Sequence, residues 1–114
     1  SLNQLIAQRS DKIEAQYREQ LGTIAPELQL QIEKLAQLRS DEGYMAEVRL
    51  LPGGFMLIEN HCPICTAATS CQQFCETELD LFQRLFEDKA IVTRTDHLLA
   101  GARRCAYKIT AIGA

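Results

Sequence analysis

Apolar residues recur with a helical period in the first third of the chain and with a strand period further on. Between residues 2 and 21 they fall four and seven positions apart, which predicts a helix with one narrow apolar stripe. The stripe consists of Leu2, Ile6, Ile13, Tyr17 and Leu21. A stripe of this kind packs either on its own domain or on a second copy of the chain.

A second helix is predicted after Gly22 and Thr23, which break the first one. Pro26 suits the first turn of this second helix, and Gly43 suits the left-handed position that closes it. Its apolar face is formed by Leu28, Ile32, Leu35 and Ala36. Residues 1–42 are therefore expected to form a helical linker and dimerisation region.

Residues 43–114 predict two pairs of strands around one helix. The elements are strands over 44–51 and 55–59, a helix over 71–87, and strands over 90–95 and 104–110. The turn signal Pro52-Gly53-Gly54 joins the first two strands into a hairpin. The predicted fold class is α+β, in which a leading helical pair is followed by a β-β-α-β-β unit with an antiparallel sheet. Both parts are expected to form one compact domain.

Composition and charge narrow the function classes. The chain has 114 residues, 46% of them hydrophobic and 24% charged, which is typical of one globular domain. The net charge of −3, with both signs mixed along the chain, argues against nucleic-acid binding by this piece alone. No apolar run approaches the ~18 residues of a membrane span, and no leader precedes the first helix, so a cytoplasmic location is expected. The chain starts at Ser1, and we expect it to be a fragment of a longer protein.

The cysteines are the main candidates for chemistry. Four of the five lie within residues 60–75, and the fifth is Cys105. In a chain without an export signal, such clustering favours metal binding or redox chemistry over a disulfide framework. Cys62 and Cys65 form a Cys-x-x-Cys turn, Cys75 lies on the inward face of the predicted helix, and Cys105 lies on a predicted strand. Four thiols from such elements predict a site for zinc or an iron–sulfur cluster.

Other residues compete for places in this site. His61 or a non-protein ligand competes with Cys65 for the fourth position. Cys71 lies one turn before Cys75 and is expected to pack as a small apolar residue, with metal ligation as the alternative. Simple burial is also the alternative for the remaining cysteines. His97 is expected in a surface loop.

A redox function is the second hypothesis. Cys62 and Cys65 resemble the active-site pair of a thiol-disulfide oxidoreductase, but such pairs follow a strand in a parallel βαβ unit, which the pattern does not predict. No serine nucleophile elbow, phosphate-binding glycine loop or His-Glu-x-x-His helix occurs, so we expect the chain not to be an enzyme. Glu76, Glu78 and Asp80 are predicted to form the solvent-exposed side of the helix over 71–87.

Several stretches resemble a known family. Residues 38–48, 59–65, 71–72, 74–75 and 101–107 are similar to the C-terminal sensor half of bacterial winged-helix transcriptional regulators. The nearest type is the SufR-like, iron–sulfur-cluster-sensing repressors, often grouped loosely with DeoR- or ArsR-type regulators. The resemblance implies a dimer, an N-terminal winged helix that reads DNA, and a cysteine site for a metal or cluster.

The family's three-cysteine pattern falls on Cys62, Cys75 and Cys105. The chain departs from the family in having no winged helix and in having two further thiols, Cys65 and Cys71. A fourth thiol suits stable zinc, whereas three thiols with an open position suit a labile cluster. The expected function is therefore a metal- or cluster-binding sensor and homodimerisation domain of a transcriptional regulator. A structural domain stapled by zinc is the third hypothesis.

Overall fold

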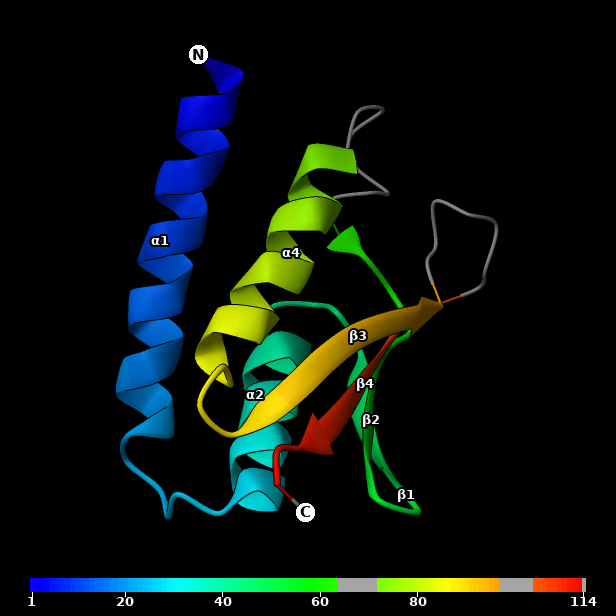
Figure 1. Ribbon diagram of the computed structural model, residues 1–114. Helices are drawn as coiled ribbons and strands as arrows, with labels where there is room; N and C mark the ends of the chain where they lie inside the picture. Colours follow the sequence, from blue (N-terminus) through cyan, green and yellow to red (C-terminus); the bar gives the residue numbers. More distant parts are fainter. Residues whose placement is uncertain (64–71, 97–103, 114) are drawn as a thin grey trace.

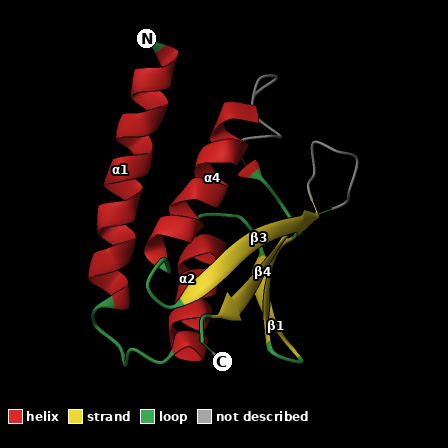
Figure 2. Ribbon diagram, viewed as in Figure 1, coloured by secondary structure: helices red, strands yellow, loops and turns green. Residues whose placement is uncertain are grey.

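Three helices and four antiparallel strands make up residues 1–63, 72–96 and 104–113, which are the residues that the computed structural model describes (Figures 1 and 2). The elements in chain order are α1 (Leu2–Leu21), α2 (Leu28–Asp41), β1 (Ala46–Leu51), β2 (Gly54–Glu59), α4 (Gln72–Leu85), β3 (Ala90–Asp96) and β4 (Cys105–Ala111). The α+β class and the antiparallel sheet predicted from the sequence are confirmed. None of the helices in these ranges is long and apolar enough to cross a membrane.

The two leading helices begin and end largely where the sequence signals lie. A capping box formed by Ser1 and Gln4 satisfies backbone groups at the start of α1. The start predicted for α2 was too early, because Pro26 precedes the helix and Glu27 still has an extended backbone (φ −59°, ψ 133°). Gly43, with φ +98°, closes α2 in the left-handed conformation as predicted.

The first strand begins two residues later than predicted. Met45 has φ +50°, so the chain is still turning when it passes Tyr44, and regular pairing starts at Ala46. Tyr44 is buried and its carbonyl oxygen accepts a hydrogen bond from the backbone N–H of His61 at 3.2 Å. Within β1, residues 46–48 and Leu51 are half-buried, whereas Leu50 is 67% exposed although it is apolar.

The sheet has the strand order β1-β2-β4-β3, and all three neighbouring pairs are antiparallel. Helix α2 packs on β1 and β2, and α4 packs on β3, so both cover one face of the sheet. Helix α1 forms an outer layer against α4 and α2 (Figure 1). Ile6, Tyr17 and Leu21 of the predicted stripe are buried and Ile13 packs against the core, so most of the stripe packs on its own domain, whereas Leu2 is 56% exposed.

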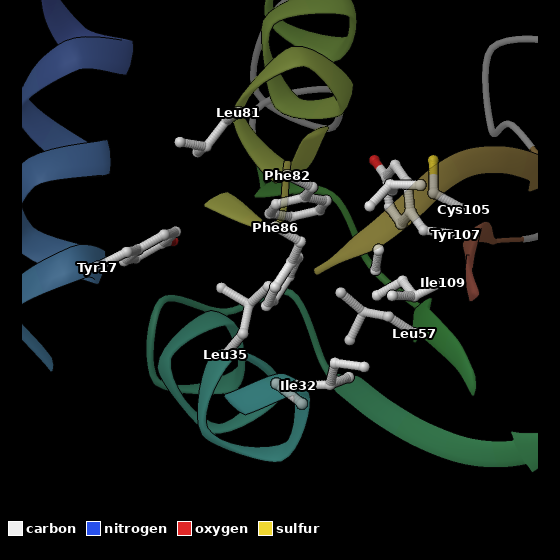
Figure 3. Packing of buried hydrophobic residues seen from close by; sticks show 13 residues of the cluster. Tyr17, Ile32, Leu35, Leu57, Leu81, Phe82, Phe86, Cys105, Tyr107 and Ile109 are labelled. Carbon is white, nitrogen blue, oxygen red and sulfur yellow. The ribbon is translucent and has the colours of Figure 1, made fainter. Parts of the chain in front are cut away.

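The core lies between the helices and the sheet (Figure 3). Its fully buried members come from α2, β2, α4 and β4, and the largest are Ile32, Leu35, Leu57, Phe82, Phe86, Tyr107 and Ile109. The rings of Phe82 and Tyr107 meet edge to face, with centroids 4.9 Å apart. Tyr17 of α1 reaches inward to this core, which joins the leading helices to the rest of the fold.

Helix α4 buries a charged residue that the sequence pattern placed in solvent. The predicted inward positions Cys75, Phe82 and Phe86 are buried, as expected. Glu78, however, is only 7% exposed, because α1 covers the side of α4 that the pattern predicts to face solvent. The prediction that Glu78 belongs to a solvated face is therefore wrong.

Candidate functional site

The segments that carry three of the predicted ligands meet at one end of the sheet. Cys105 is the first residue of β4 and pairs in register with Glu59, the last residue of β2. Cys62 follows three residues after Glu59. Arg94 of β3 donates from Nη1 to the carbonyl oxygen of Cys75 at 3.0 Å, which holds the beginning of α4 against this end. In Figure 1 the ends of β2 and β3 and the start of β4 lie together, and α4 begins on the same, upper side of the picture.

These three cysteines differ in exposure. Cys75 and Cys105 are 5% and 6% exposed, and Cys62 is half-buried. His61, a predicted competitor for the fourth position, is half-buried beside Cys62. Two further candidates, Cys65 and Cys71, lie outside the described residues, as does His97. Within the ranges described, no three His, Cys, Asp or Glu side chains are grouped as a metal site would require.

A buried ionic network adjoins the cysteine segments. Arg39 of α2 is 1% exposed, and its guanidinium contacts two buried carboxylates, Glu59 and Glu78. Its Nε lies 2.6 Å from Glu59 Oε2, and its Nη2 lies 3.1 Å from Glu59 Oε1, which is a bidentate pair. The same Nη2 lies 2.6 Å from Glu78 Oε2. That contact is an ion pair only, because its geometry does not make a hydrogen bond and leaves Glu78 Oε2 without a donor.

Aromatic side chains complete the surroundings of the guanidinium. Its Cζ lies 3.5 Å from the ring centroid of Tyr44 and 5.0 Å from that of Phe82. Tyr44 also donates its hydroxyl to Glu78 Oε1 at 3.3 Å. On the other side, Arg39 Nη1 donates to the hydroxyl oxygen of Tyr17 at 3.2 Å, and that hydroxyl donates to Glu42. The network therefore joins α1, α2, β2 and α4.

The charges within this network do not balance. Among the described residues of the network, one buried cation faces two buried carboxylates, and a further cation, Arg9, is 37% exposed and lies 4.0 Å from Glu78. Burial raises the pKa of Glu59, although Arg39 acts in the opposite direction. Burial likewise raises the pKa of the Tyr44 hydroxyl to about 12. Arg39 stays charged, because the two carboxylates outweigh its own loss of hydration and raise its pKa.

The sequence does contain a signal for this network. Arg39 occupies the helical position four residues after Leu35, which belongs to the apolar face of α2. Glu59 continues the buried alternation of β2, two residues after Leu57, and Glu78 lies one turn after Cys75. A charged residue at a core position in three separate elements indicates that the three pair with one another in the interior.

Polar contacts also hold α1 on α4. Arg84 donates to Glu14 at 2.7 Å and to the hydroxyl of Ser10 at 3.2 Å, and Arg18 donates to Glu14 and to the carbonyl oxygen of Arg84. Burial acts to raise the pKa of Glu14, but its bonds to Arg84 and Arg18 lower it overall. The guanidinium of Arg9 stacks 5.5 Å from the ring centroid of Phe74, beside Cys75. The interface of α1 is therefore partly ionic.

A separate cavity of about 510 Å³ lies between the end of α1, the connection to α2 and the end of α4. Its basic lining residues are Arg18, Arg84 and Lys89. Each of them already binds a group of the chain itself, and Lys89 donates to the carbonyl oxygen of Pro26 at 3.0 Å. We therefore regard the cysteine end of the sheet as the stronger candidate site.

Comparisons of the chain with models of known families, with curated proteins and with solved structures give no match.

Proposed function

We propose that the chain is the metal- or iron–sulfur-cluster-binding, ligand-sensing and dimerisation domain of a transcriptional regulator. The observation that supports this proposal is that the segment after β2, the start of α4 and the start of β4, which carry Cys62, Cys75 and Cys105, lie at one end of the sheet. The resemblance of residues 38–48, 59–65 and 101–107 to the sensor half of SufR-like repressors supports the same function.

The chemistry of the donors suits this role. Cys62, Cys75 and Cys105 would supply three thiolates, with Cys65 as the fourth ligand. Soft thiolates select zinc and iron–sulfur clusters over hard cations. A bound metal or cluster would crosslink segments that are far apart in the sequence. Gain or loss of that crosslink is the signal that we assign to the domain.

The signal needs a route to DNA. We assign DNA binding to an N-terminal winged-helix domain outside this chain, and transmission to α1 and α2. Helix α1 contacts α4 close to Cys75 through Arg9 and Phe74, so a shift at the start of α4 reaches α1 directly. The homodimer expected from the resemblance remains part of the proposal. Leu2 and Leu5, which are 56% and 64% exposed on α1, are the apolar side chains that such a dimer would cover first.

Serine substitutions test the ligand assignment. In protein purified without oxygen, Cys75→Ser and Cys105→Ser are expected to lose most of the bound metal, because serine is a poor ligand for soft metals. Cys71→Ser is the matched control, since Cys71 is expected to pack rather than bind. Metal content equal to the unaltered chain in both Cys75→Ser and Cys105→Ser, with the fold intact by circular dichroism, would remove the ligand assignment.

Two alternatives remain open to experiment. A zinc staple without sensing is favoured by the burial of Cys75 and Cys105 next to the core; it predicts that dimerisation and partner affinity do not change when metal is removed. A thiol-disulfide oxidoreductase using Cys62 and Cys65 predicts turnover with a dithiol. The described sheet is antiparallel throughout, whereas such active sites occupy parallel βαβ units, so we rank this alternative lower.

A further inference from the structure

The buried guanidinium of Arg39 touches the two segments that lead to the cysteines. Glu59, its bidentate partner, lies three residues before Cys62 and opposite Cys105 in the sheet. Glu78, its second carboxylate, lies three residues after Cys75, which is about one helical turn. One side chain therefore joins the end of β2 to the first turns of α4, and the start of β4 is linked to it through the pairing of Cys105 with Glu59.

A second contact joins the same helix to the cysteine turn. Gly43, just after α2, approaches Pro63 so closely that a Cβ atom at Gly43 would lie 3.2 Å from Pro63 Cγ. The backbone of His61, next to Cys62, bonds to Tyr44 at 3.2 Å. The residues just after α2 thus contact the segment around Cys62 directly, in addition to the contacts made by Arg39.

Stability alone does not account for such a network. Taking a guanidinium and two carboxylates out of water carries a large desolvation penalty for each ion, and well-packed apolar residues of similar volume are often equally or more stabilising. Buried ionic groups are retained in some proteins because they fix one arrangement of the surrounding elements. Here the elements that are fixed are those that carry Cys62, Cys75 and Cys105.

We propose that Arg39 is the positioning residue of the cysteine site, holding the three cysteine-bearing segments in register and tying them through Tyr17 to α1. This inference deepens the proposed function and rests on it for the role of the thiols as ligands. The contact of Arg39 with Tyr17 and the contact of Tyr17 with Glu42 extend the tie to the outer helix. A displacement of the Cys62 or Cys75 segment would then shift α1 through a chain of direct contacts.

The test uses variants that remove the paired contacts of Arg39 with Glu59 and Glu78 without leaving a buried charge unpaired. The triple variant Arg39→Met/Glu59→Gln/Glu78→Gln removes all three charges together. Arg39→Lys keeps the charge but cannot form the fork that reaches Glu59 and Glu78 at once, and it provides a second folded variant. The matched control is Arg49→Met/Glu47→Gln, which removes an exposed 3.4 Å pair on β1, with side chains 60% and 42% exposed.

The first readout is the rate at which iodoacetamide alkylates Cys105 in metal-free, reduced protein. Trypsin releases this cysteine in peptide 105–108, apart from the other four, so mass spectrometry can follow it alone. Both folded variants are expected to react about tenfold faster than the unaltered chain, because the segment opens more often. The control is expected to react at the unaltered rate.

The free energy of unfolding is measured by urea titration on the same samples. If Arg39 acted only on global stability, a variant as stable as the unaltered chain would be alkylated at the same rate as that chain. Unchanged alkylation in the folded variants would overturn the inference.

The second readout is cobalt(II) affinity, followed by the absorption of thiolate-bound cobalt. We expect both variants to bind cobalt about tenfold more weakly than the unaltered chain, as is typical when residues that orient metal ligands are changed. If the unaltered chain binds no cobalt while alkylation is accelerated in the variants, the proposed function fails and the positional role stands. If the chain binds cobalt and the variants match it in both readouts, the function stands and the positional role fails.

Discussion

Replacing Arg39 by methionine is expected to destabilise the fold strongly. The side chain is 1% exposed and contacts Glu59 and Glu78, which are 3% and 7% exposed. Methionine fills a similar volume but leaves both carboxylates buried without their cation. Removing one partner of a buried ion pair costs about 3–5 kcal/mol. A domain of this size has a total free energy of unfolding of about 5–15 kcal/mol, so the substitution consumes a large part of it.

Urea unfolding measured by circular dichroism checks this magnitude. With a slope of about 2 kcal/mol per molar urea, a loss of about 4 kcal/mol lowers the midpoint by about 2 M. Arg49→Met is the control: its exposed pair with Glu47 contributes about 0–1 kcal/mol, so its midpoint should stay close to that of the unaltered chain. The neutral triple variant should regain most of the loss, because no buried charge is left unpaired. A loss of no more than about 1 kcal/mol in Arg39→Met would refute the reasoning.

Three further substitutions are informative. Tyr17→Phe removes a hydroxyl bonded to Arg39 and is expected to cost about 1–3 kcal/mol and to speed amide hydrogen exchange in α1; unchanged exchange would contradict the tie to that helix. The pKa of Glu59 is raised in the folded protein, so the free energy of unfolding falls as the pH rises above 4.5, the ordinary pKa of a glutamate side chain. Urea titrations should show a smaller decline with pH in Glu59→Gln. Glu14 has a lowered pKa and the opposite sign: Glu14→Gln should cost up to about 1 kcal/mol at neutral pH and nothing once the pH falls below the folded pKa. Parallel pH curves for both glutamine variants and the unaltered chain would count against these signs.

Much of the fold follows from local patterns in the sequence. Spacing of apolar residues, the turn at residues 52–54 and the left-handed glycine at Gly43 predict the elements to within about two residues. The start of α2 and the start of β1 differ from the prediction because Glu27 and Met45 adopt backbone conformations that no local pattern specifies. The strand order also depends on long-range pairing, which periodicity does not reveal.

The candidate site was only partly predictable. Cysteine spacing and the period of each element place Cys75 and Cys105 on inward faces, and the structure confirms their burial. The pattern within any single element does not predict the ionic network, because Arg39, Glu59 and Glu78 lie on three different elements and Glu78 resembles its exposed neighbours on α4. Glu78 is buried by α1, which lies more than 50 residues away in the sequence, so its environment depends on how distant helices pack. Charges at core positions deserve to be matched across elements before they are assigned to the surface.

The central claim is that this chain binds a metal or cluster through its cysteines. The most direct test is the iron, zinc and acid-labile sulfide content of the unaltered chain purified without oxygen, together with its absorption spectrum. The account predicts either a brown protein with iron and sulfide or a colourless protein with about one zinc per chain. A folded, metal-free protein with reactive thiols that takes up neither zinc nor iron would contradict it.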